Sequence, residues 1–120
     1  MKVTYNGMDK HLNVTATVIF LEELAMSEYG AYEDGCAESK DLVNAVFHRT
    51  GSVLVGSVSP SKYVTVTIKL STAEYLMRPT TLALHISKWR EWASAGDFGL
   101  ANAYVRSGVA LQKHLEAAIG

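Results

Sequence analysis

Residues 52–70, which read SVLVGSV-SPSK-YVTVTIKL, are the stretch that decides the fold. From Tyr63 to Leu70, apolar residues alternate strictly with polar ones, and a period of two in β-branched residues is typical of a half-buried strand. Ser52 to Val58 is a second short apolar run, and residues 59–62 between the two runs are turn formers. We therefore expect a β-hairpin in the middle of the chain.

Three further stretches have the pattern of strands. Lys2–Tyr5 and His11–Phe20 predict an N-terminal hairpin, because the Asn6-Gly7 pair between them readily takes the positive φ of a tight turn. Thr81–Ile86 alternates again, with its leucines and its isoleucine on one side. The sequence thus predicts an antiparallel sheet of about five strands.

Helices are expected between and after these strands, and their ends are indicated by capping residues, glycines and a proline. The expected helices are Leu21–Tyr29 ending at Gly30, Ser39–Arg49 capped by Ser39, a turn from Ser71 to Met77 ending before Pro79, Lys88–Ala95 between Ser87 and Gly96, and a long helix from Asp97 to about Ala118. Ala31–Ser39 is expected to be a surface loop. Together these elements predict a single α+β domain over residues 1–120, with helices packed on the sheet.

The composition of the chain limits the kinds of protein that it can be. Of the 120 residues, 48% are hydrophobic and 19% are charged, which is typical of a globular chain. The net charge of −1 disfavours a general attraction to nucleic acid or to an anionic membrane. Residues 1–42 hold three lysines against eight acids, whereas residues 43–120 hold eight bases against four acids, so the chain has either two differently charged faces or a simple drift in composition. No stretch resembles a signal peptide or approaches the roughly 20 apolar residues of a membrane span, and we expect a cytoplasmic protein.

The residue types that carry chemistry are scattered. No histidine lies three or four residues from another histidine or from Cys36, the single cysteine, so no short metal motif is present among His11, His48, His85 and His114. Cys36 lies among acids, which disfavour its thiolate. The acids Glu22, Glu23, Glu28, Glu33, Asp34 and Glu38 are expected to form a solvated face. The sequence predicts no catalytic residue, no metal and no cofactor, and hence no enzyme.

The densest group of candidate binding residues is aromatic and basic. It comprises Arg78, His85, Lys88, Trp89, Arg90 and Trp92. Trp89 and Trp92 are three apart and would be neighbours on a helix. Tryptophan beside arginine is typical of protein-binding hot spots and also of surfaces that stack single-stranded nucleic acid, but about four bases are few for a phosphate footprint. The alternative is that one or both indoles fill the core.

Small residues also line one side of the predicted last helix, at Ala103, Ser107 and Ala110 with Gly108 adjacent. They would allow close backbone approach, either to the chain's own sheet or to another subunit.

The order of elements carries a family resemblance. A helix over residues 39–49 leads into Thr50-Gly51-Ser52-Val53-Leu54 and Ser57-Val58, a hairpin and Tyr75 follow, and Asn102-Ala103-Tyr104-Val105-Arg106 lies in the closing helix. This arrangement resembles the bacteriophage head–tail joining and tail-completion proteins. It departs from them at His48-Arg49, where Ala-Pro is usual, after Tyr75, where no Glu-x-Gly-Thr follows, and at Ser107, where proline is common.

Two functions follow as hypotheses. The resemblance implies a structural component, without chemistry, that contacts copies of itself in a phage particle. The aromatic and basic group implies instead a small regulatory or inhibitory module that docks on a host protein. Both hypotheses expect a protein as the partner.

Overall fold

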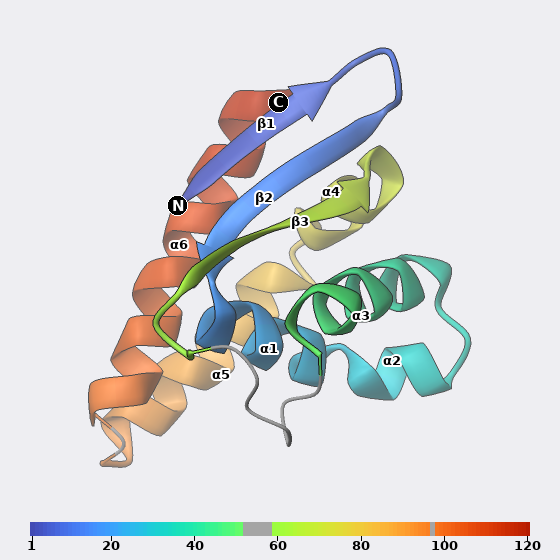
Figure 1. The fold of residues 1–120 in the computed structure, drawn as a ribbon. Helices are drawn as coiled ribbons and strands as arrows, with labels where there is room; N and C mark the ends of the chain where they lie inside the picture. Colours follow the sequence, from blue (N-terminus) through green and yellow to red (C-terminus); the bar gives the residue numbers. More distant parts are fainter. Residues whose placement is uncertain (52–58, 97) are drawn as a thin grey trace.

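The computed structural model describes residues 1–51, 59–96 and 98–120. Three strands and six helices lie in this part of the chain. In order they are β1 (Lys2–Asn6), β2 (His11–Thr17), α1 (Val18–Ser27), α2 (Tyr29–Glu33), α3 (Ala37–Thr50), β3 (Tyr63–Lys69), α4 (Leu70–Leu76), α5 (Leu82–Ser94) and α6 (Phe98–Ile119). The α+β class is confirmed, and Figure 1 shows the sheet in front with α1, α5 and α6 behind it.

The sheet is antiparallel, with the order β1-β2-β3. The alternation predicted for Tyr63 to Lys69 is confirmed, because Val64, Val66 and Ile68 are buried and the residues between them are exposed. In register, Val66 pairs with Val14 of β2, which in turn pairs with Val3 of β1. The apolar side of each strand therefore faces the helices.

The open side of the sheet is polar. The hydroxyls of Thr15 and Thr65 lie 2.7 Å apart, and the Thr67 hydroxyl donates to Asn13 Oδ1 at 2.7 Å. These cross-strand pairs follow from the same register that aligns the buried residues on the other side.

The two predicted hairpins have different outcomes. The N-terminal hairpin is confirmed, but its turn extends to Lys10, which takes the positive φ of 55° in place of Gly7, and Asn6 Oδ1 accepts the Met8 N–H. For the central hairpin, β3 is a strand as predicted and pairs with β2. Its expected partner, Ser52–Val58, lies outside the described residues.

The prediction of about five strands is wrong for the described residues, and Thr81–Ile86 is the clearest error. These residues begin α5, a helix whose buried positions are Leu82, His85, Ile86 and Trp89. Leu82 and Ile86 are four apart and share a face in a helix as they do in a strand, so both periods fit them. The discriminating position is Leu84, which is 45% exposed. The segment Leu82–Ser94 contains a single β-branched residue, which favours the helix.

A second boundary error lies at the end of β2. The strand was expected to run to Phe20, but α1 begins at Val18. The first amides of α1 find acceptors in the turn before β3: Val18 N–H donates to the Lys62 carbonyl at 2.9 Å and Ile19 N–H to the Pro60 carbonyl at 3.0 Å. Because this distant turn satisfies amides that a helix start leaves open, the chain turns into a helix despite its β-branched residues.

Three smaller predictions are also corrected. The expected surface loop Ala31–Ser39 overlaps the end of α2 and the first turn of α3. Gly30 lies inside α2 and does not end a helix, and α3 begins at Ala37 with Cys36 at its N-cap position. Ser39 is consequently not a cap but a buried residue inside α3. Ser87 does not cap a helix either, since it lies in the middle of α5.

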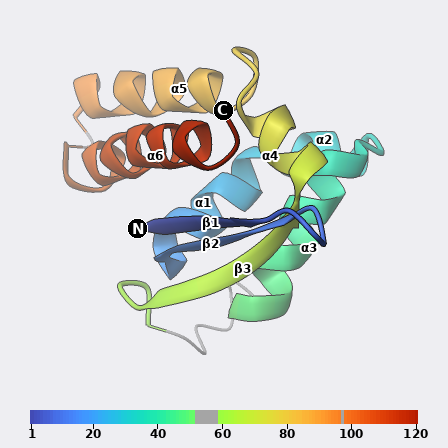
Figure 2. The ribbon, with the colours of Figure 1, turned by 90° about the horizontal axis from the view of Figure 1, so that it is seen from above.

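The helices and the inner side of the sheet enclose one core. Figure 2 shows α5 and α6 side by side as a layer beyond α1, with α3 beside β3. Trp89, Phe20 and Leu12 are among the largest fully buried side chains. Gly108 of α6 lies against α5, where an added Cβ would come within 2.8 Å of Ile86 Cγ1. The small residues of α6 thus serve contact within the chain at this position.

Candidate functional site

Helix α5 separates the predicted aromatic and basic group into buried and exposed members. Trp89 is 1% exposed, and its ring centroid lies 5.9 Å from that of Phe20 and 5.8 Å from that of Tyr104, so this indole belongs to the core. His85 is also buried, whereas Trp92 is 45% exposed. The sequence did not decide whether the two indoles lie in the core or on the surface. In the structure, Trp89 lies in the core and Trp92 on the surface.

The basic members of the group do not all lie together. Lys88 and Arg90 are exposed on α5. Arg78 follows α4, and its guanidinium lies 5.5 Å from the centroid of the Tyr75 ring. Of the six predicted residues, His85, Lys88, Trp89 and Trp92 line a common feature, and Arg78 and Arg90 are not part of it.

That feature is a cleft of about 210 Å³ between α1 and α5, which we call the α1–α5 cleft. Its lining is shared between the two helices and comprises Glu23, Met26, Ser27, His85, Lys88, Trp89 and Trp92. Met26 is 51% exposed, so that a thioether and an indole are both accessible at this cleft. Sequence reasoning missed the contribution of α1, because no local pattern relates residues more than 50 positions apart.

Glu23 is the acidic group of the α1–α5 cleft. Its Oε1 accepts the indole N–H of Trp89 at 3.4 Å and the Ser27 hydroxyl at 3.5 Å, both long for hydrogen bonds. Burial raises the pKa of Glu23, against the opposing effects of these two hydrogen bonds and of His85. The carboxylate is thus partly removed from water without a close donor to replace it.

A buried carboxylate lies next to the cleft, at Glu28, where α1 meets α2. Oε1 accepts the Tyr75 hydroxyl at 2.7 Å and the Ser39 hydroxyl at 2.8 Å, and Oε2 pairs with His85 Nε2. We call these four residues, Ser39, Glu28, Tyr75 and His85, the Glu28 cluster. Because Glu28 is 4% exposed, the expectation that all six acids of this region form a solvated face is wrong at this position.

Hydrogen bonding sets the charge state of the Glu28 cluster. Burial tends to raise the pKa of Glu28, but the hydrogen bonds from His85, Tyr75 and Ser39 outweigh it, and the pKa is lowered. Burial, together with the neighbouring carboxylate, raises the pKa of Tyr75 to about 12. Glu28 is therefore an anion held by donors from α3, α4 and α5.

The Glu28 cluster has the geometry of a structural linker. Within the described residues, Glu28 is the hydrogen-bond partner of the His85 side chain, and both oxygens of Glu28 are occupied. No sequence pattern could have found this cluster, since its members are spread from residue 28 to residue 85.

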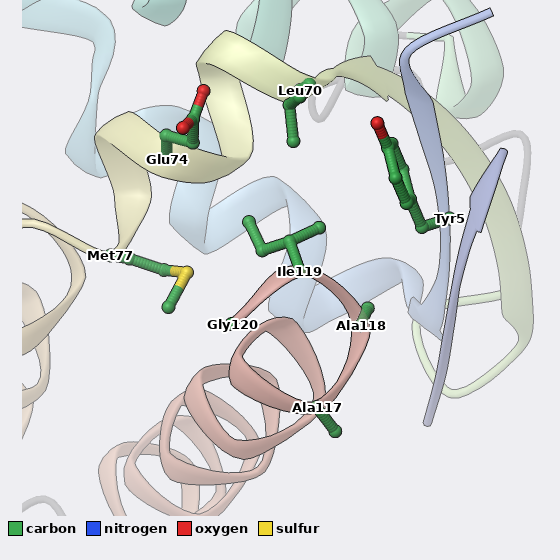
Figure 3. Close-up of a pocket in the computed structure, with 8 residues that line it drawn as sticks. All are labelled: Tyr5, Leu70, Glu74, Met77, Ala117, Ala118, Ile119 and Gly120. Atoms are coloured by element: carbon green, nitrogen blue, oxygen red, sulfur yellow. The ribbon is translucent and has the colours of Figure 1, made fainter. Parts of the chain in front are cut away.

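A larger groove lies at the other end of the molecule (Figure 3). It has a volume of about 630 Å³ and lies between Tyr5 of β1, Leu70 and Glu74 of α4, Met77, the last residues of α6 and Gly120, which follows α6. Figure 3 shows the Tyr5 ring and Glu74 on separate walls, with Ile119 between them. The groove offers apolar surface and one carboxylate, without the convergent polar groups that mark a specific site.

Comparisons with known proteins do not assign a function. No protein-family model, curated protein or solved structure matches the chain. Over residues 1–51, 59–96 and 98–120, no group of three histidine, cysteine or acidic side chains is placed to hold a metal ion. In the same ranges no helix has the length and apolarity to cross a bilayer. The α1–α5 cleft is therefore the feature of the molecule from which a function can be inferred.

Proposed function

We propose that this protein is a non-enzymatic binding module that docks another protein on the α1–α5 cleft. The observation that carries the proposal is the accessibility of Trp92 and Met26 at one cleft. Tryptophan is enriched at binding hot spots, and methionine adapts its shape to a partner. A cleft with a rigid floor, here the core residue Trp89, presents such side chains without ordering a loop on binding.

The larger groove of Figure 3 is a weaker candidate for the docking surface. Three of its eight lining residues are small, Ala117, Ala118 and Gly120, whereas the α1–α5 cleft combines an indole, a thioether and a carboxylate whose pKa is shifted. Shifted titratable groups cluster at functional sites.

The test compares the proteins retained by immobilised wild-type chain and by Trp92→Ala. We expect Trp92→Ala to remain folded, because its side chain is not in the core, and to bind a retained protein at least about tenfold more weakly, the scale of a hot-spot loss. The matched control is Tyr63→Ala, which removes another exposed aromatic residue, from the open side of the sheet. Equal retention by wild type and Trp92→Ala would exclude the cleft as the docking surface.

Self-association, as in the phage assembly proteins that the sequence resembles, is the second candidate function. The observation that favours it is the position of β1, which among residues 1–51, 59–96 and 98–120 is hydrogen-bonded to β2 alone and lies at the edge of the sheet (Figure 1). An edge strand can pair with a strand of another copy. The molar mass of the chain in solution tests this function.

A further inference from the structure

We propose that the α1–α5 cleft accepts an arginine side chain of the docked protein, with the guanidinium between the Glu23 carboxylate and the Trp92 indole. This inference rests on the proposed docking function and specifies the chemistry of the partner. It follows from three features of the cleft: an incompletely satisfied carboxylate, an accessible indole, and the absence of a cation already in contact with that carboxylate within the described residues.

The first feature is the Glu23 carboxylate. Its hydrogen bonds of 3.4 and 3.5 Å are both near the limit of the interaction, and Trp89 and Ser27 are neutral donors. A carboxylate in a partly buried position is stabilised most by a charged donor with two N–H groups in one plane, which is the geometry of arginine. The raised pKa of Glu23 is consistent with a carboxylate that lacks such a partner.

The second feature is the indole of Trp92. It is 45% exposed and makes no aromatic ring contact with another described residue. A guanidinium stacks on an indole face with a favourable cation–π interaction, and tryptophan is the best of the aromatic residues for it. Met26, on α1, adds apolar surface against which the aliphatic part of an arginine side chain can pack.

The third feature concerns the other charges of the cleft. His85 Nε2 contacts Glu28 Oε2, and this is the one contact of ion-pair geometry found among the described residues. Lys88 lines the cleft but is exposed, and it forms no ion pair with a described carboxylate. The Lys88 ammonium therefore leaves the Glu23 carboxylate unpaired, but it repels a cation that enters the cleft. Replacing Lys88 by a neutral residue should strengthen the binding of arginine.

The experiment titrates the protein with acetyl-Gly-Arg-Gly-amide and with the same peptide carrying citrulline, a neutral analogue of arginine. The readout is the NMR signal of the indole N–H groups, of which the chain has two, from Trp89 and Trp92. We expect a saturable shift of these signals with the arginine peptide and none with the citrulline peptide. Equal shifts with both peptides would overturn the inference.

Variants locate the binding. Glu23→Gln keeps an acceptor for Trp89 and should weaken arginine binding at least about tenfold, since it removes a charge-assisted hydrogen bond. The matched control is Glu22→Gln, one residue earlier on α1 and outside the cleft lining, which should bind as wild type does. Lys88→Ala should bind more tightly. Wild-type affinity in Glu23→Gln, with its fold intact by circular dichroism, would also overturn the inference.

The two proposals fail separately. If the arginine peptide does not bind but Trp92→Ala still loses a retained protein, the docking surface stands and its arginine specificity is wrong. If the arginine peptide binds and Trp92→Ala retains every protein that wild type retains, the cleft takes arginine but is not the docking surface.

Discussion

The buried carboxylate of Glu28 links helices that are far apart in the chain. It ends α1, begins α2 and accepts hydrogen bonds from α3, α4 and α5. A buried charge is tolerated only where donors replace the water that it has lost, and here three side chains do so. One residue therefore links the junction of α1 and α2 to α3, α4 and α5.

The Glu28→Gln variant tests this role. The amide keeps the shape of the side chain but turns one acceptor oxygen into a donor, which leaves a donor of the cluster unmatched, and we expect the free energy of unfolding to fall by about 3 kcal/mol. Urea denaturation followed by circular dichroism measures it. Glu33→Gln, at an exposed position, should unfold as wild type does. Wild-type stability in Glu28→Gln would contradict the structural role of the cluster.

The same variant changes the response to acid. The folded-state pKa of Glu28 lies below its ordinary value of 4.5, so the stabilisation is fully present above that value and is lost as the pH falls through the lowered pKa. Wild type should therefore lose stability more steeply below pH 4.5 than Glu28→Gln does. Glu22 and Glu23, whose pKa values burial raises, act in the opposite direction, and both residues are present in wild type and in Glu28→Gln.

At the scale of elements, the contact between α5 and α6 depends on the absence of a side chain at Gly108. An added methyl group would lie 2.8 Å from Ile86 Cγ1 and 2.9 Å from Trp89 Cζ3. Both neighbours are fully or nearly fully buried and cannot move without disturbing the core. The close approach of the two helices thus requires glycine at this position.

Gly108→Ala should consequently destabilise the protein by about 1–2 kcal/mol, because the strain of overpacking exceeds the gain in helix propensity. The matched control is Gly99→Ala on the same helix, where an added Cβ would meet nothing within 4 Å, and it should be neutral or stabilising. Thermal denaturation of the two variants measures the difference. A Gly108→Ala variant as stable as Gly99→Ala would show that α5 and α6 move apart at little cost.

At the scale of the whole molecule, β1 pairs with β2 alone among the described residues, and its other side is available for another strand. If the protein assembles with copies of itself, its molar mass by light scattering should rise with concentration in the micromolar range, and Trp92→Ala should leave this rise unchanged because its side chain lies at the α1–α5 cleft. A constant monomer mass of about 13.1 kDa at high concentration would contradict self-association.

Local sequence patterns correctly predicted those helices and strands whose hydrophobic period fits only one type of secondary structure. The alternation from Tyr63 to Lys69, the N-terminal hairpin and the long helix ending near residue 118 were all predictable, because a period of two or of 3.6 expresses which side of an element is buried. The α+β class follows from these elements. In Thr81–Ile86 the spacing of Leu82 and Ile86 fits the period of a strand as well as that of a helix. The helix forms, and it also buries His85 and Trp89.

The candidate site could be predicted only in part. The sequence singled out Trp89 and Trp92 but could not tell which was core, because that depends on the side of α5 that faces Phe20 and Tyr104. Glu23 and Met26 reach the cleft, and Glu28 reaches His85, through contacts between residues far apart in the chain. The sequence by itself determined which segments are helices or strands where the period is unambiguous. Only the tertiary structure decided which polar side chains meet, because burial and hydrogen bonding between distant residues leave no periodic trace in the chain.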